Sequence, residues 1–181
     1  MNKVKGKTSI LSAMKTFSHP SGDEAELCGL NKAIYSTVTV AHNEWKYIVY
    51  LEFSLSQELT VVPCFLDNFY QIFLILLINA AYAIEAQLEI TGEAKGKIVI
   101  TTRRTEKHAE ITISDSGTGM SDEIRRKVFD PFFTTKPVNK GTGQGLAIAN
   151  DIIVNKHNGS IKIKTEQRKG TTFVLRLPYQ S

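Results

Sequence analysis

The sequence has little of what defines several large classes of protein. Only two cysteines, Cys28 and Cys64, occur among its 181 residues, and they form no CxxC pair. This excludes a disulfide framework and a cysteine-rich zinc site, and it suits a reducing cytosol. The longest apolar run, residues 72–78, is far shorter than the roughly 20 residues that a bilayer span needs. No apolar stretch follows the basic N-terminus, so that segment is not a signal peptide.

A large excess of charge of one sign is also missing. The 22 Lys and Arg residues against 18 Asp and Glu leave a net charge of +4, which is too small to predict a nucleic-acid partner. A polyanionic small ligand or an acidic protein partner fits this charge equally well. Hydrophobic residues make up 42% of the chain and charged residues 22%, so the composition predicts a folded domain rather than disorder.

The chain divides into a short N-terminal part and a main domain. Residues 9–17 carry apolar side chains at helical spacing, and Pro20 ends this element. The polar residues 18–26 that follow are typical of a linker. We therefore predict a tail, a short helix and a linker over residues 1–29, and a single domain over residues 30–181.

Patterns within the main domain predict a layer of helices and a sheet. Helices are expected over residues 31–42, 66–89, 121–129 and 145–158, and strands over 47–55, 97–105, 109–115, 160–166 and 171–177. Ser121 is the expected N-cap of the third helix, and Gly159 is the residue expected to end the fourth. Short hairpin connections argue against a doubly wound parallel sheet. The predicted fold is an α+β, two-layer sandwich, with helices packed on one face of a mixed, mainly antiparallel sheet.

Five of the 12 glycines fall between residues 117 and 145. They form the segments Asp115-Ser-Gly-Thr-Gly119 and Gly141-Thr-Gly-Gln-Gly145. Such clusters let the backbone approach a ligand closely and direct N–H groups at it. The second cluster runs directly into a predicted helix, whose N-terminal amides suit phosphate. Neither cluster is a Walker loop, because no Gly-Lys-Ser/Thr follows, and neither has the Rossmann spacing.

Four segments in a fixed order carry a family resemblance. Residues 71–80 carry Asn79 on a predicted helix, residues 115–119 begin at the end of a predicted strand, and residues 129–137 and 141–145 come after them. They resemble the N box, first glycine box, F box and second glycine box of the Bergerat-fold ATP-binding superfamily, which includes DNA gyrase and the sensor histidine kinases. The resemblance covers about residues 30–178. It is greatest to the catalytic ATP-binding domain of sensor histidine kinases, especially the nitrogen-regulation type.

The resemblance implies a role for each segment. Asp115 would accept a hydrogen bond from the adenine amino group, and Gly117 would let the base approach the backbone. Thr172 would complete the base contacts through water, and Asn79 would offer its amide oxygen to Mg²⁺, which takes few protein ligands. The implied ATP-binding set consists of Asn79, Ala83, Asp115, Gly117, Gly119, Met120, Phe132, Thr135, Lys136, Lys140, Gly141, Thr142, Gly143, Gln144, Gly145, Leu146 and Thr172.

Two further assignments on the loop leave alternatives open. Gly141, Gly143 and Gly145 would form a mobile lid over the triphosphate. The lysines at 136 and 140 would steady the phosphate charge, or they serve only to keep the loop soluble. The phenylalanines at 132 and 133 would dock the loop against the body of the domain, or they are ordinary core residues.

Two positions depart from the family pattern. Ile75 stands one helical turn before Asn79, where gyrase-like ATPases carry a glutamate base and many histidine kinases a second asparagine. Residues four apart share a helix face, so Ile75 should lie beside Asn79, where it can neither activate water nor bind metal. The expected consequence is weak intrinsic ATP hydrolysis. Tyr82 replaces the polar residue that the family often carries three positions after this asparagine.

The acceptor for a phosphoryl group is missing from the sequence. None of the four histidines, His19, His42, His108 and His157, is followed by the usual acceptor motif. Residues 10–20 resemble the end of the second helix of a histidine kinase dimerisation hairpin. We interpret the chain as the ATP-binding half of a cytoplasmic histidine protein kinase, membrane-anchored upstream or not. Its implied partners are ATP and ADP, an upstream histidine-bearing domain, a response-regulator receiver domain and, in the full-length protein, a second copy.

Three other readings stay open from the sequence. The first is a degenerate domain that holds nucleotide and acts only through protein contacts, which Ile75 and Tyr82 favour. The second is a serine kinase of the anti-sigma type, which shares the four boxes. The third is a gyrase-type clamp, which predicts a glutamate at position 75 that is absent.

Overall fold

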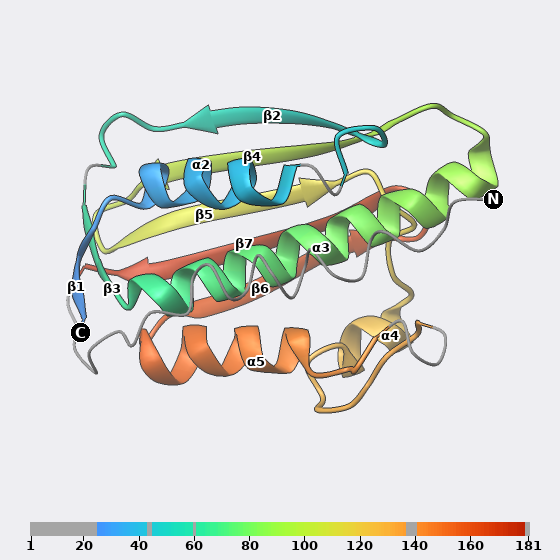
Figure 1. Ribbon diagram of the computed structural model, residues 1–181. Coiled ribbons are helices and arrows are strands. Elements are labelled where there is room, and N and C mark those ends of the chain that lie inside the picture. Colours follow the sequence, from blue (N-terminus) through green and yellow to red (C-terminus); the bar gives the residue numbers. More distant parts are fainter. Residues whose placement is uncertain (1–24, 43–44, 60, 137–140, 180–181) are drawn as a thin grey trace.

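The computed structural model describes residues 25–42, 45–59, 61–136 and 141–179, and its centre is a five-stranded sheet (Figure 1). The strand order is β2-β4-β5-β7-β6, and only the β2–β4 pair is parallel. This confirms the predicted mixed, mainly antiparallel sheet. The strands are β2 (Val49–Leu55), β4 (Gly96–Arg104), β5 (His108–Asp115), β6 (Ser160–Glu166) and β7 (Gly170–Pro178).

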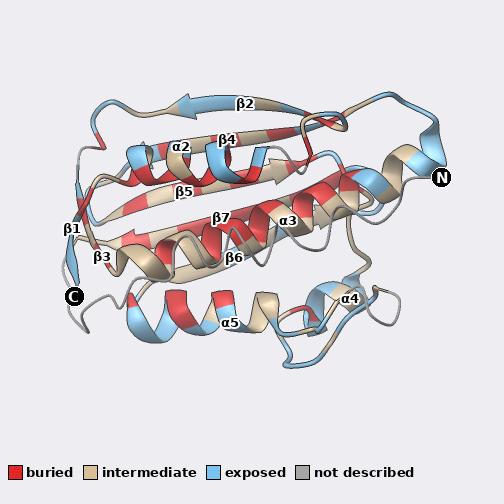
Figure 2. Cartoon of the chain, in the orientation of Figure 1, coloured by how far each residue is buried: buried red, intermediate tan, exposed pale blue. Residues whose placement is uncertain are grey.

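Helices cover one face of this sheet, as predicted. Figure 1 shows α2 (Leu30–Ala41), α3 (Leu66–Thr91) and α5 (Gly145–Asp151) lying side by side, roughly along the direction of the strands. A π-helical turn, η2 (Ile152–Lys156), continues α5. In Figure 2 the buried residues gather where the helices meet the sheet, and the exposed ones lie on the outer sides. The result is a two-layer sandwich with its core between the layers.

The long helix α3 is the centre of the core. Its inward side chains are fully or nearly fully buried at Phe69, Ile72, Phe73, Leu76, Leu77, Ala80 and Ile84. Their three- and four-residue spacing is the reason this segment is an amphipathic helix rather than a strand. Within the described residues, α3 is the one helix that is long and apolar enough to cross a membrane by length and composition. Its packing against the sheet identifies it here as a core helix.

A small two-stranded ribbon lies beside the main layers. Strand β1 (Glu26–Cys28) pairs with β3 (Val62–Cys64), and Cys28 Sγ donates a hydrogen bond to the Cys64 carbonyl oxygen at 3.3 Å. Both thiols are free and buried, and burial raises the pKa of each. Because a thiol with a raised pKa is a poor nucleophile, these cysteines are packing residues. Residues 26–28, which the sequence placed before the domain, therefore pack with it.

The two shorter helices differ in how well the sequence predicts them. Helix α4 (Asp122–Lys127) begins as expected, with the Ser121 hydroxyl accepting a hydrogen bond from the Ile124 N–H. The prediction that Gly159 ends the last helix is wrong, since the left-handed residue there is Asn158, with φ +50°. Gly159 is needed for a different reason: a Cβ on it would lie 2.3 Å from the Arg176 carbonyl oxygen.

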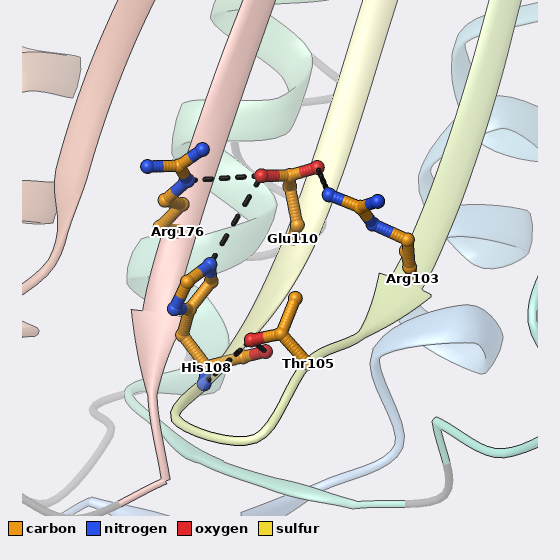
Figure 3. A network of polar contacts seen from close by, with 5 residues as sticks. All are labelled: Arg103, Thr105, His108, Glu110 and Arg176. Carbon is orange, nitrogen blue, oxygen red and sulfur yellow. Dashed lines mark hydrogen bonds and ion pairs between the residues drawn. The ribbon is translucent and has the colours of Figure 1, made fainter.

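The face of the sheet turned away from the helices carries a charged network (Figure 3). Glu110 on β5 accepts hydrogen bonds from Arg103 on β4 at 2.8 Å and from Arg176 on β7 at 2.9 Å. Burial acts to raise the pKa of Glu110, but the two arginines outweigh it, so the pKa is lowered. His108 Nε2 lies 4.0 Å from the same carboxylate. The network bridges three central strands on the outer face and contributes about 1 kcal/mol, as partly exposed ion pairs do.

His157 connects the end of η2 to the start of α3. Its Nε2 accepts a hydrogen bond from the Phe65 N–H at 3.1 Å, so the ring proton must be on Nδ1, which lies 3.0 Å from the Ile152 carbonyl oxygen. Burial lowers the pKa of this histidine, so the folded protein holds it neutral. A depressed pKa means that its contribution to stability is present above pH 6.5 and is lost as the pH falls through the folded pKa.

We expect His157→Ala to lower the free energy of unfolding by about 2 kcal/mol at pH 7.5, because the Phe65 N–H loses its acceptor and the Ile152 carbonyl oxygen loses one of its two donors. The difference in free energy of unfolding between wild type and variant should be smaller at pH 5.5. At that pH the unfolded chain binds a proton at His157 more readily than the folded protein does, which lowers the stability of the wild type. Guanidinium denaturation at both pH values measures this. His42→Ala, at an exposed position, is the control. An equal difference at both pH values would contradict the assignment.

Candidate nucleotide site

Asp115 is the buried acid of the site. It is the last residue of β5, it faces the helices, and only 7% of it is exposed. Its Oδ1 accepts hydrogen bonds from the N–H groups of Gly117 at 2.8 Å and Thr171 at 3.3 Å. Burial raises its pKa to about 6 despite these two bonds. Within the described residues no donor is bonded to Oδ2, so one carboxylate oxygen is left for a ligand.

The turn after Asp115 packs directly on α3. A Cβ on Gly117 would lie 2.5 Å from the Ala83 Cβ, and the Thr118 N–H donates to the Ala83 carbonyl oxygen at 3.2 Å. Gly119 has φ +63°, and a Cβ there would meet the Glu166 backbone. The sequence assigned Gly117 to the approach of a base, and the structure adds a packing reason. The turn is thereby fixed one helical turn from Asn79.

The threonine opposite Asp115, whose backbone N–H donates to its Oδ1, is Thr171 and not the predicted Thr172. In the β5–β7 ladder Asp115 is opposite Thr171, while Ser114 is opposite Thr172. The hydroxyls of Ser114 and Thr172 lie 2.8 Å apart on the outer face of the sheet. Because a shift of one residue moves a side chain to the other face of a strand, Thr172 cannot contact a ligand at Asp115. Counting the ladder back from the Lys169-Gly170 turn would have indicated this.

These neighbouring threonines form a matched pair for mutation. Thr171 is 4% exposed and its hydroxyl lies 3.1 Å from that of Thr165. Valine keeps the backbone N–H that bonds Asp115 but removes the hydroxyl on the same face of β7. We expect Thr171→Val to weaken ATP binding by about three- to tenfold, as the loss of one hydrogen bond from that hydroxyl to the ligand does, and Thr172→Val to leave it unchanged. Isothermal titration calorimetry of both variants measures this. A larger loss for Thr172→Val would restore the original assignment.

Asn79 presents its amide oxygen to a cation. Lys136 Nζ donates a hydrogen bond to Asn79 Oδ1 at 2.8 Å and lies 4.4 Å from the centroid of the Tyr82 ring. Burial lowers the pKa of Lys136. No cluster of three or more His, Cys, Asp or Glu that could hold a metal occurs in the described part of the chain. A single amide oxygen that already faces a positive charge fits Mg²⁺, which keeps most of its waters and takes its other ligands from phosphates.

Ile75 lies where its spacing from Asn79 predicts, at the N-terminus of α5. A Cβ on Gly145, the first residue of α5, would lie 3.2 Å from Ile75 Cγ2. An aliphatic side chain therefore faces the helix end whose free N–H groups suit a phosphate. It offers neither a base nor a ligand there.

The glycine loop packs on the backbone of the F box. Gly143 has φ +69°, and a Cβ on it would lie 2.4 Å from the Phe132 carbonyl carbon. Phe132 itself has φ +66° and is 71% exposed. The expectation that its side chain docks the loop is therefore wrong, because its backbone makes the contact and its ring faces solvent. Phe129 is the aromatic residue of this segment that packs against the core.

The remaining predicted residues are spread around the same region. Met120 and Leu146 pack against the core, and the Met120 N–H donates to the Thr165 hydroxyl at 2.9 Å. The Gln144 N–H donates to the Thr142 hydroxyl at 3.4 Å, and Thr135 is exposed. Lys140 lies outside the described residues, as do Pro137 and the segment 10–20. Sequence reasoning missed Thr171 and Thr165, which carry no motif of their own.

A buried carboxylate at a strand end, an amide oxygen facing a cation and a glycine loop entering a helix define a nucleotide-binding α+β domain. The chain belongs to the family of histidine kinase-, DNA gyrase B- and HSP90-like ATPases, whose family model matches residues 66–181. Within that family its relatives are sensor histidine kinases, so the chain is an ATP-binding catalytic domain of that type, as predicted.

The relatives are longer proteins. The chain is 31% identical to the signal transduction histidine-protein kinase AtoS of Escherichia coli K12, over 98% of the chain and 28% of AtoS. It is 32% identical to the sensor histidine kinase ZraS of Salmonella typhi, over 93% of the chain and 34% of ZraS. It thus spans about a third of their length. The nucleotide-free catalytic domain of histidine kinase ThkA matches with a TM-score of 0.73 and 29% identity, covering 86% of the chain and 96% of that domain.

Proposed function

We propose that this domain transfers the γ-phosphoryl group of Mg-ATP to a histidine on a separate, upstream domain. The observation that carries the proposal is Asp115: a buried carboxylate with one oxygen fixed by two backbone N–H groups and one oxygen free. A fixed acceptor of this kind selects the amino group of adenine. Guanine carries a carbonyl oxygen at the same position, which a carboxylate repels.

The phosphate end of the site would neutralise charge and hold the nucleotide in line with its acceptor. Asn79 Oδ1 would hold Mg²⁺, and that ion supplies charge neutralisation at the phosphates when it is bound. Lys136 and the N-terminal amides of α5 would bind the phosphate oxygens. The γ-phosphorus then forms a bond to an imidazole nitrogen of the acceptor as its bond to the β-phosphate oxygen breaks, leaving ADP.

Ile75 supports transfer over hydrolysis. The side chain beside Asn79 and Gly145 is aliphatic, so no carboxylate is placed there to activate water. A kinase gains from this because a base at that position would spend ATP without phosphorylating the acceptor. We therefore expect slow hydrolysis by the isolated domain.

The wider setting of the domain is part of the same proposal. The acceptor domain would be upstream of strand β1, and a receiver-domain aspartate would take the phosphoryl group next. The histidine kinase ThkA, whose catalytic domain this chain resembles, has been solved in complex with the response regulator protein TrrA. We place the domain in the cytoplasm, on a homodimeric full-length protein that binds no nucleic acid.

The test is transfer in trans. The chain is mixed with radiolabelled γ-phosphate Mg-ATP and the histidine-bearing hairpin encoded upstream of it. We expect label on the hairpin histidine, lost when that histidine is replaced by glutamine, and little free phosphate in the absence of the hairpin. If ATP binds but no label reaches the hairpin, the chain is a nucleotide-binding regulatory module. Label on a serine of a separate protein would instead favour a serine kinase.

A further inference from the structure

The ammonium of Lys136 lies at the oxygen that the proposed function assigns to the metal ion. Its Nζ is 2.8 Å from Asn79 Oδ1 and 4.4 Å from the centroid of the Tyr82 ring. Residues three apart on a helix share a face, so both partners lie on one side of α3. No ion pair between described residues includes Lys136. Among the described residues, its positive charge is met by an amide oxygen and an aromatic face, and by no anion.

This arrangement is incomplete as a binding site for a charge. A partly buried ammonium loses hydration, and neutral partners replace only part of it. An anion is therefore the missing partner, and a polyphosphate has the required chemistry. A divalent cation and an ammonium at one amide oxygen also repel each other strongly at such short range. Lys136 and a metal ion thus exclude each other at Asn79.

We propose that Lys136 is the resident cation of this site, which leaves Asn79 when Mg²⁺ and the nucleotide arrive and moves to the phosphate oxygens. The inference rests on the proposed function, because the exchange needs an incoming polyphosphate. Tyr82 is the positioning residue of this exchange, since its ring attracts the ammonium and holds it beside Asn79. This role explains an aromatic residue at position 82, because a small polar side chain offers no ring face to the ammonium.

The start of the glycine loop is coupled to the same side chain. A Cβ on Gly141 would lie 2.9 Å from Lys136 Cδ and 3.1 Å from Lys136 Cβ. The stem of Lys136 therefore fills the space against the Gly141 backbone. When the ammonium moves from Asn79, the contact between the Lys136 stem and the Gly141 backbone must change too. The movement of Lys136 therefore couples the glycine loop to the oxygen that would bind the metal.

The test compares nucleotide binding with and without Mg²⁺. The quantity measured by calorimetry is the enhancement, defined as the dissociation constant of ATP without Mg²⁺ divided by that with Mg²⁺. In Lys136→Met, ATP binding without Mg²⁺ should weaken by about tenfold, since a charged hydrogen bond to phosphate is lost. With Mg²⁺ the affinity should change much less, because the lost phosphate contact is offset by the absence of an ammonium that must leave Asn79. The enhancement should therefore rise by about tenfold. The control is Lys127→Met, which removes an exposed lysine paired with Glu123.

A second readout needs no nucleotide. The side-chain amide signals of Asn79, assigned by their loss in Asn79→Ala, should shift in Lys136→Met and in Tyr82→Leu, and stay in place in Lys127→Met. Asn79 signals that do not shift in Lys136→Met would show that Lys136 does not contact Asn79. If ATP binds with an enhancement that Lys136→Met leaves unchanged, the exchange is wrong and the proposed function stands. If the wild-type chain takes up no nucleotide, the proposed function fails and the exchange fails with it.

Discussion

Replacing Asp115 by asparagine should weaken ATP binding by about 100-fold or more and abolish the preference for ATP over GTP. The N–H groups of Gly117 and Thr171 both point at Oδ1, so the asparagine must turn its carbonyl oxygen toward them. Its NH₂ group then takes the place of Oδ2 and meets the adenine amino group, donor against donor. A buried donor left without an acceptor costs about 1–3 kcal/mol, and the lost charge adds to this.

The measurement is calorimetric titration of wild type and variant with Mg-ATP and Mg-GTP. Asp122→Asn, which makes the same chemical change at an aspartate side chain that is 79% exposed, is the matched control and should bind ATP as wild type does. An unchanged ATP-over-GTP ratio in Asp115→Asn would remove Asp115 from the site.

The same substitution should stabilise the empty protein, which separates a lost ligand contact from a misfolded chain. A carboxyl whose pKa rises from 3.8 to about 6 on folding favours the folded state only while it is protonated, and that stability is lost as the pH rises through 6. The shift corresponds to roughly 3 kcal/mol. Asp115→Asn should therefore be more stable than wild type by about 1–3 kcal/mol at pH 8, with the difference disappearing toward pH 4.

Replacing Asn79 by alanine should remove the benefit of Mg²⁺. The variant loses the amide oxygen that faces the Lys136 ammonium and would hold Mg²⁺, so its ATP affinity with Mg²⁺ should fall to the value without Mg²⁺. Phosphoryl transfer to the hairpin should fall by about 100-fold, in the range seen when a group that stabilises transferring charge is lost. ADP binding should persist in part, because the Asp115 contact with the base remains.

Calorimetry with and without Mg²⁺, together with the transfer assay, measures both effects. The control is Asn155→Ala, which removes an exposed asparagine of η2 that donates a hydrogen bond to Asp151 at the end of α5. Full Mg²⁺ dependence in Asn79→Ala would place the metal elsewhere.

The fold could be predicted from the sequence where periodicity is strong. The spacing of apolar residues in α3 and the alternation in β5 specify one helix and one half-buried strand with little ambiguity. The short hairpins then require antiparallel pairing. The end of the last helix could not be predicted, because Gly159 is the expected terminator by propensity alone. The reason that residue 159 is a glycine, the close approach of the Arg176 backbone, comes from a distant strand.

The site residues that lie in the four sequence motifs could be predicted. Asp115 and Asn79 occupy positions that the boxes identify, and Ile75 lies beside the glycine loop as its helical spacing requires. Thr171 could not be distinguished from Thr172 without the strand register, since either is a threonine. The bond from Lys136 to Asn79 joins residues 57 apart, and no local pattern predicts a contact of that kind.

The central claim is that a buried carboxylate reads the purine ring of a bound nucleotide, and one titration tests it most directly. The wild-type chain is titrated in a calorimeter with Mg-ATP and then, separately, with Mg-GTP. The account predicts one ATP per chain, bound about 100-fold or more tightly than GTP. No uptake of any adenine nucleotide, or equal affinity for the two purines, would contradict it.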